Sequence, residues 1–87
     1  MRNLNCLINA LEKIISELNA NDKHESSNFF QIRYDQIRNF GDKVPFEIIE
    51  TLSTCRAMSQ YANFTLKEEE LLDNVVNNAI KVKSRTP

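Results

Sequence analysis

The histidine and the two cysteines are the side chains of this sequence with the widest chemical repertoire. His24 lies in a polar stretch with no cysteine or acidic residue at the spacing of a zinc ligand set, so we interpret it as a solvated loop residue. Cys6 and Cys55 are too few for a disulfide scaffold, and two such thiols are most often free. We expect no redox role for either, and Cys55 is predicted to be a small core residue.

The acidic run Glu68-Glu69-Glu70 is the next candidate for chemistry, because paired carboxylates can act as general acid and base. The run falls in the first turn of a predicted helix, however, where the helix dipole favours negative charge. The sequence also lacks GxSxG, P-loop, GxGxxG and HExxH motifs and contains one glycine. We therefore predict a protein that is not an enzyme and that needs no cofactor, no metal and no small-molecule substrate.

Basic residues gather near the end of the sequence, at Lys81, Lys83 and Arg85. Cations at the end of a helix are favoured by its dipole, which gives the cluster a structural explanation. The same residues can also meet an acidic protein surface or anionic lipid. They are the candidate partner-binding residues of this sequence.

Charge and turn composition bear on nucleic-acid binding. With 11 Lys+Arg against 12 Asp+Glu the net charge is -1, which lacks the positive field that collects phosphates. A helix-turn-helix is an alternative hypothesis, because a short turn, Phe40-Gly41-Asp42-Lys43, joins two predicted helices. The helix that follows would bring Glu47 and Glu50 toward phosphates, so we expect no nucleic-acid partner.

The elements that position these residues are predicted to be helices. The sequence has 87 residues, of which 41% are hydrophobic and 26% charged, and its one glycine and two prolines are too few for the turns of a β-sandwich. We predict a single all-α domain over residues 1–87, an antiparallel four-helix bundle. Its helices are expected at about 3–19, 27–40, 45–62 and 65–83, followed by a short flexible tail at 84–87.

Apolar residues recur at three- and four-residue spacing within each predicted helix. These stripes are Leu4, Leu7, Ile8, Leu11, Ile14, Ile15 and Leu18; Phe29, Phe30, Tyr34, Ile37 and Phe40; Ile48, Ile49, Leu52, Cys55, Ser59 and Ala62; and Leu71, Leu72, Val75, Val76, Ala79, Ile80 and Val82. The aromatic residues are therefore expected to lie mainly in the bundle core.

Helix start and stop signals agree with these ranges. Ser26 or Ser27 can cap the second helix, and Gly41 stands where a left-handed residue ends it. Val44-Pro45 suits the start of the third helix, and Thr65 with Glu68 matches a capping box for the fourth.

No apolar run approaches the roughly 18 to 20 residues that span a bilayer, and Glu12 and Lys13 interrupt any signal-peptide core at the N-terminus. We expect a cytoplasmic protein.

The second half of the sequence resembles the enterocin A immunity family, the cytosolic partners of pediocin-like (class IIa) bacteriocins. The resemblance lies in a Val44-Pro45 start of a helix that carries Ile48, Ile49 and Leu52, and in the Glu-rich entry to the last helix over residues 63–72. It covers residues 41–81, about half the chain. The chain lacks tryptophan and ends soon after this helix, whereas several family members carry a longer, more aromatic C-terminal segment.

The resemblance implies an antiparallel four-helix bundle that protects a producing cell from its own secreted peptide without catalysing a reaction. It implies a cytosolic protein, in part at the inner face of the membrane, that binds the membrane mannose phosphotransferase permease when bacteriocin occupies it. It also implies specificity toward the C-terminal half, which includes Lys81, Lys83 and Arg85. The alternative is a small helical antitoxin or adaptor that binds a cytosolic protein.

Overall fold

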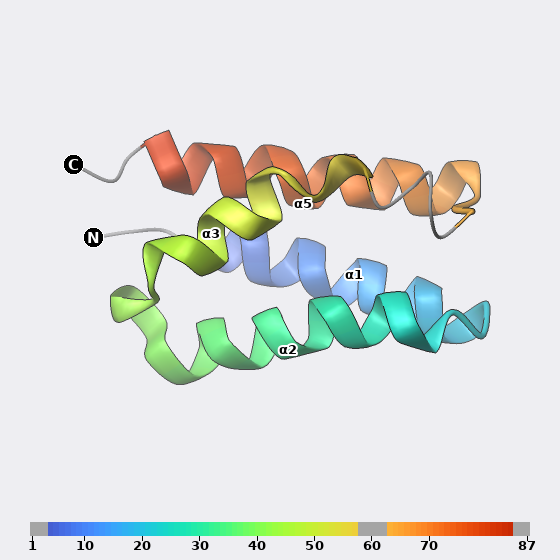
Figure 1. Cartoon of the computed structure of the whole chain (residues 1–87), viewed down its shortest axis with the longest axis horizontal. Coiled ribbons are helices and arrows are strands. Elements are labelled where there is room, and N and C mark those ends of the chain that lie inside the picture. Colours follow the sequence, from blue (N-terminus) through green and yellow to red (C-terminus); the bar gives the residue numbers. More distant parts are fainter. Residues whose placement is uncertain (1–3, 58–62, 85–87) are drawn as a thin grey trace.

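A computed structural model describes residues 4–57 and 63–84 of the chain. In this part it contains α1 (Asn5–Ala20), α2 (His24–Phe40), α3 (Phe46–Ser53) and α5 (Leu66–Ser84), and no strand. Two short 3-10 helices, η1 (Gly41–Lys43) and η2 (Cys55–Ala57), lie before and after α3. Neighbouring helices run in opposite directions along the long axis of the molecule (Figure 1). The predicted all-α antiparallel bundle is confirmed.

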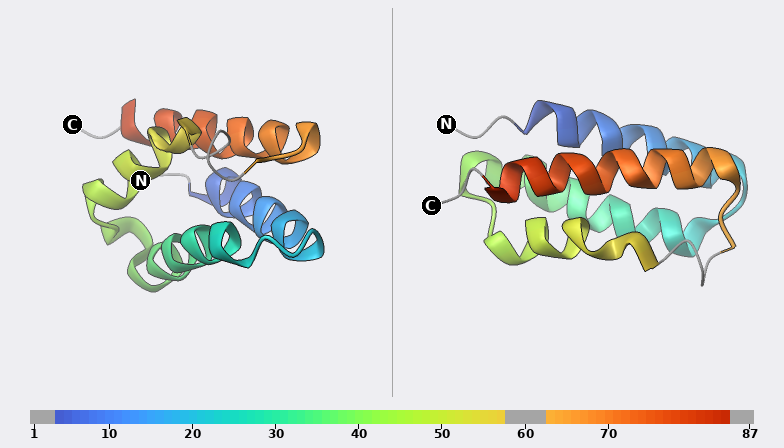
Figure 2. Two further views of the ribbon diagram at one scale, coloured as in Figure 1. Left: turned by 45° about the vertical axis from the view of Figure 1, so that its right-hand side comes forward. Right: turned by 90° about the horizontal axis from the view of Figure 1, so that it is seen from above.

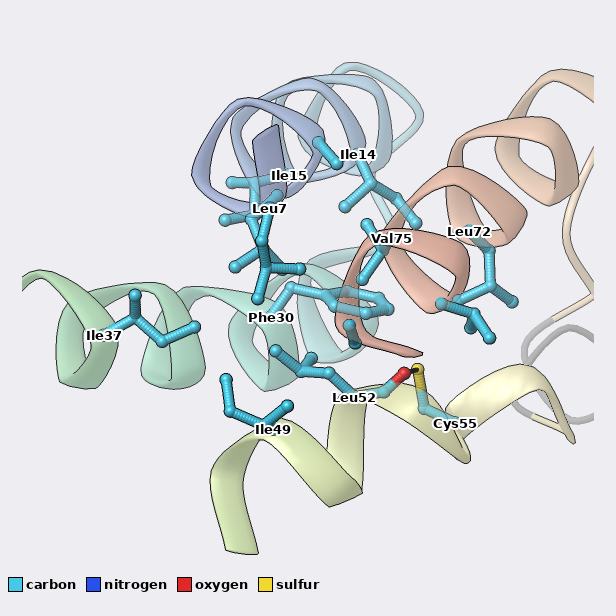
Figure 3. Close-up of a cluster of buried hydrophobic side chains, with 14 of the residues drawn as sticks. Leu7, Ile14, Ile15, Phe30, Ile37, Ile49, Leu52, Cys55, Leu72 and Val75 are labelled. Carbon is cyan, nitrogen blue, oxygen red and sulfur yellow. Dashed lines mark hydrogen bonds between the residues drawn. The ribbon is translucent and has the colours of Figure 1, made fainter. Parts of the chain in front are cut away.

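Helices α1 and α5 form the centre of the packing, because they contact each other, while α2 packs on α1 and α3 lies along α5. Figure 2 shows this arrangement from two further directions. The predicted stripe of α1 is buried at every position but Ile8, which packs partly against the core. Side chains from all four helices meet between them (Figure 3), and the largest fully buried ones include Phe30, Leu11, Ile14, Ile37, Leu52 and Leu72. Burial of such a side chain stabilises a fold by about 1.5–3 kcal/mol.

The link between α1 and α2 is shorter than predicted, because α2 begins at His24 and not near residue 27. Asp22 adopts a left-handed conformation with φ 60°, and the Lys23 N–H donates to the Leu18 carbonyl at 2.8 Å. This 6→1 bond, with a second from Asp22 N–H to the Asn19 carbonyl, forms a Schellman motif that ends α1. The chain can then enter the next helix at once.

The prediction that Ser26 or Ser27 caps α2 is therefore wrong. Both serines are buried in the first turns of the helix, where α2 packs on α1. Small side chains suit such a position, and their polarity made this turn resemble a loop in the sequence. Glu25 lies in the first turn, where the helix dipole favours its charge.

The other end of α2 follows the prediction at Gly41, whose φ of 58° is a conformation that residues with a Cβ rarely adopt. Phe40, by contrast, was predicted to face the core and is 45% exposed. It is the last residue of α2, and the chain turns away at Gly41 before another helical turn can cover the ring.

The third helix is shorter than the predicted range 45–62, because α3 ends at Ser53 and η2 follows. Side-chain hydroxyl groups near the end of α3 explain why it stops early. Thr51 donates to the Glu47 carbonyl, and Ser53 and Thr54 both donate to the Glu50 carbonyl. Such bonds compete with the helical ladder and favour helix ends. The predicted core positions Ser59 and Ala62 lie outside the described residues.

Helix α5 begins as the capping box predicts. The Thr65 N–H donates to Glu68 Oε1 at 2.7 Å, and the Glu68 N–H donates to Thr65 Oγ1 at 3.2 Å. The predicted stripe is buried at Leu72, Val75, Val76, Ala79 and Val82 and partly buried at Leu71. Ile80 was also predicted in this stripe, yet it is 45% exposed. Of the predicted tail 84–87, Ser84 still belongs to α5, and residues 85–87 lie outside the described residues.

Candidate functional site

The predicted partner-binding residues lie at the end of α5, as far as the structure describes them. Lys81 is exposed and Lys83 is half-exposed, whereas Arg85 lies outside the described residues. The buried Val82 between the two lysines holds this turn against the core. Successive helical positions are about 100° apart, so the two ammonium groups leave the helix on either side of that contact.

Lys83 lies against the start of α3, which runs antiparallel to α5. Its Nζ is 4.0 Å from Glu50 Oε1 and 6.0 Å from the centre of the Phe46 ring. An exposed ion pair of this length contributes about 0–1 kcal/mol, so it orients the lysine more than it stabilises the bundle. The Lys83 ammonium group therefore stays accessible beside an aromatic ring.

Exposed apolar side chains accompany these lysines, and the sequence did not single them out as a surface. Phe46 is 42% exposed and Ile80 is 45% exposed, near the start of α3 and the end of α5. Phe40 and Lys43 belong to the same end of the bundle, where α2 passes through η1 into α3 (Figure 1). We call this surface the basic-apolar end, and it consists of Phe40, Lys43, Phe46, Ile80, Lys81 and Lys83.

A second cluster lies at the opposite end, around the Glu68 carboxylate, which is fully buried. Glu68 Oε2 accepts from Asn21 Nδ2 at 2.8 Å, and Glu68 Oε1 accepts from Lys23 Nζ at 2.5 Å. Lys23 also donates to the Asn63 carbonyl at 2.8 Å, and its ammonium group lies 5.6 Å from the Phe64 ring centre. The capping box predicted Glu68 as a helix cap, but the link to Asn21 and Lys23 had no signal in the sequence.

Two opposing effects set the ionisation of Glu68. Burial raises the pKa of the carboxyl, but the hydrogen bonds from Asn21, Lys23 and the Thr65 N–H lower it, as does the charge of Lys23. The net pKa lies below the usual value of 4.5, so the carboxylate is charged at neutral pH. Both carboxylate oxygens accept hydrogen bonds, and this arrangement ties the α1–α2 link to the start of α5. We assign the cluster to the fold and not to catalysis.

The cysteines and the histidine form no reactive group with their neighbours. The Cys55 Sγ–H donates to the Leu52 carbonyl at 3.2 Å (Figure 3), and burial raises the pKa of this thiol to about 11. Cys55 is thus the small core residue that the sequence predicts, and Cys6 is exposed.

His24 begins α2, and its ring nitrogens lie 3.3 Å from Asn19 Oδ1 and 3.6 Å from Asp22 Oδ1. Within residues 4–57 and 63–84 no three His, Cys, Asp or Glu side chains gather as a metal site would require.

An open groove of about 450 Å³ lies between α1 and the start of α5. Two of its carboxylates already have partners, since Glu12 accepts from the Tyr34 hydroxyl and Glu17 accepts from Asn21. The hydrogen bond to the Glu12 carboxylate, and to a smaller extent partial desolvation, raise the pKa of Tyr34. The groove is lined by Asn9, Glu12, Lys13, Ser16, Glu17, Lys67 and Leu71. Its charges balance, so it does not favour an ion of either sign.

Comparisons with protein-family models, with curated proteins and with solved structures found no match to this chain. The resemblance to the enterocin A immunity family therefore rests on the residue pattern alone. Among the described residues, no helix is long and apolar enough to cross a membrane. The surface with the features of a binding site is the basic-apolar end.

Proposed function

We propose that this protein is a bacteriocin immunity protein that acts in the cytoplasm by binding, not by catalysis. Its partner would be the membrane mannose phosphotransferase permease occupied by a pediocin-like bacteriocin, approached from the cytosolic side. The observation that carries the proposal is the basic-apolar end, where Phe46 and Ile80 are exposed beside Lys81 and Lys83. Exposed apolar groups rimmed by charges are typical of surfaces that bind another macromolecule.

The origin and arrangement of the residues at the basic-apolar end also support the proposal. The segment that resembles the immunity family, residues 41–81, supplies Phe46, Ile80 and Lys81, and Lys83 follows it directly in the same helix. Lys83 is held beside Phe46 by Glu50, so an aromatic ring and a cation are presented together before any partner arrives. A preformed surface loses little side-chain entropy on binding.

The experiment is a protection assay. A sensitive bacterial strain expresses the protein, and the inhibitory concentration of each member of a panel of pediocin-like bacteriocins is measured with and without expression. We expect a large rise for one peptide or a few related ones. The double variant Lys81→Glu/Lys83→Glu should reduce that rise by about tenfold or more, as the loss of about 1.4 kcal/mol of binding free energy would do.

The matched control is Lys13→Glu/Lys67→Glu, which changes the net charge equally but lies on the groove between α1 and α5. It should protect as well as the unmodified protein. If no peptide in the panel loses potency while expression is confirmed, the immunity function is wrong, and an antitoxin or adaptor function becomes the better proposal.

A further inference from the structure

The charges of the bundle are divided between its two ends. The end that holds the α1–α2 link and the start of α5 has an excess of acids, with Lys23 and Lys67 as its bases. Its acidic residues are Glu17, Asp22, Glu25, Glu68, Glu69 and Glu70. The opposite end has Arg38, Lys43, Lys81 and Lys83 against Asp42, Glu47 and Glu50. The molecule is therefore a dipole along its longest dimension of 36 Å.

Two of the acids at the basic end are partly offset by their surroundings. Glu50 lies 4.0 Å from Lys83, and Glu47 occupies the first turn of α3, where the helix dipole opposes its charge. In the electric field of an anionic surface a molecule with this charge distribution turns its basic end toward the surface.

The same end carries exposed apolar side chains. Phe40, Phe46 and Ile80 are each more than 40% exposed, and they come from three different helices. Lys43 lies between Phe40 and Phe46 along the chain, and Lys81 follows Ile80. Lysines and exposed apolar side chains at the same end of the bundle match the interface of a bilayer, where cations meet lipid phosphates and apolar groups enter the acyl boundary.

We propose that the basic-apolar end docks on a bilayer that contains anionic phospholipid, with the helices directed away from the membrane plane. A soluble protein partner would require a shape-matched surface, whereas a bilayer requires only charge and exposed apolar groups at one end, and the bundle supplies both. The inference goes beyond the immunity function and holds with or without it, since it concerns lipid alone.

The test uses the purified full chain and vesicles, without bacteriocin or permease. Vesicles of phosphatidylcholine mixed with phosphatidylglycerol should sediment the protein, vesicles of phosphatidylcholine alone should not, and added sodium chloride should weaken the binding. Lys43→Glu should lower the affinity by about 25-fold, because each favourable charge near an anionic surface is worth about fivefold and the substitution both removes one and adds a repulsive one.

Matched substitutions at the two ends of the bundle test which end binds the vesicle. Phe46→Ser should lower vesicle affinity by about tenfold, in line with the loss of a partly buried aromatic group. Leu66→Ser at the acidic end, where the leucine is 80% exposed, should leave it unchanged, as should Lys67→Glu. Circular dichroism checks that each variant is folded.

Three results would overturn the inference. The first is equal binding to neutral and anionic vesicles, and the second is equal loss of affinity from substitutions at both ends. The third is no binding to anionic vesicles at all. Self-association in sedimentation velocity that Phe46→Ser abolishes would then assign this end to a second copy of the chain. Protection of cells without vesicle binding would refute the lipid inference alone, and vesicle binding without protection would refute the immunity function alone.

Discussion

At the scale of single residues, the most consequential side chain is the carboxylate of Glu68. A buried charge is costly unless hydrogen bonds and a counter-ion replace its water, and Glu68 has donors from Asn21, Lys23 and the Thr65 N–H. Lys23 keeps part of its surface in water, which reduces the cost of the pair. The cluster therefore holds its geometry through complementary bonds and not through charge attraction alone.

We expect Glu68→Gln to lower the free energy of unfolding by about 1–3 kcal/mol at neutral pH, because the amide keeps the size of the side chain but not its charged hydrogen bonds. Urea denaturation followed by circular dichroism measures it. The control Glu70→Gln changes an exposed residue of the same helix and should stay within about 0.5 kcal/mol.

The pH dependence of the same variant gives a second readout. Because the folded-state pKa of Glu68 is lowered, its stabilisation is fully present above the usual pKa of 4.5 and disappears as the pH falls through the lowered pKa. The difference between the unmodified protein and Glu68→Gln should shrink over that acidic range. A difference that stays constant with pH would show that the carboxylate does not stabilise the fold by its charge.

The two thiols should differ sharply in reactivity. With a pKa of about 11, the buried Cys55 has almost no thiolate at neutral pH, while Cys6 is exposed. A thiol reagent such as iodoacetamide should modify Cys6 in the native protein and reach Cys55 only after denaturation, as mass spectrometry would detect. Rapid modification of Cys55 in the folded protein, with Cys6 replaced by serine, would contradict its burial.

At the scale of elements, the two ends of α2 depend on backbone conformations that differ in cost. Asp22 ends α1 in the left-handed region, which an aspartate tolerates at a modest cost. Gly41 ends α2 at φ 58° and ψ -127°, a region that only glycine enters freely. The link before α2 is therefore permissive, and the link after it depends on its glycine.

We expect Gly41→Ala to lower the free energy of unfolding by about 1–3 kcal/mol. A Cβ at this position would meet nothing within 4 Å, so the effect would come from the backbone and not from a clash. Thermal and urea unfolding measure it. As a control, Asp22→Gly relieves a left-handed residue and should not destabilise the protein by more than a few tenths of a kcal/mol; an unchanged Gly41→Ala variant would mean that the turn relaxes to another conformation.

Helix existence and apolar faces could be predicted from the sequence, because periodicity records which side of a helix is buried. Two helix boundaries and the exposure of two side chains could not. The start of α2 at His24 depends on the Schellman motif at Asp22, and the end of α3 at Ser53 depends on local hydroxyl bonds. The exposure of Phe40 and Ile80 depends on where neighbouring helices end, which no local pattern contains.

The candidate surface was predicted in part for a similar reason. Lys81 and Lys83 could be proposed from their charge near the C-terminus, but their association with Phe46 and Glu50 requires α3 to lie antiparallel beside α5. The pairing of Lys23 with Glu68 joins residues 45 positions apart and likewise needs the folded bundle. These charged residues are far apart along the chain, and only the packing of the helices brings them together.

At the scale of the whole molecule, the net charge is only -1, but acidic and basic residues are concentrated at opposite ends of the bundle. The acidic end holds the buried Glu68 cluster that joins the α1–α2 link to α5, and the basic-apolar end presents exposed lysines and apolar side chains, with Lys83 beside Glu50 and Phe46. One end therefore supplies rigidity and the other supplies surface. Both the proposed immunity function and the proposed membrane docking require this separation, because substitutions that alter binding then leave the fold intact.

The bond between Lys23 and Glu68 also affects how the native state is lost with time. It links the α1–α2 hairpin to α5 across 45 positions of sequence, so it can form only after those elements have docked. Interactions that are made late contribute little to the folding rate and mostly raise the barrier to unfolding. We therefore expect this pair to lengthen the lifetime of the folded bundle, and with it the time that the basic-apolar end remains presented to a partner.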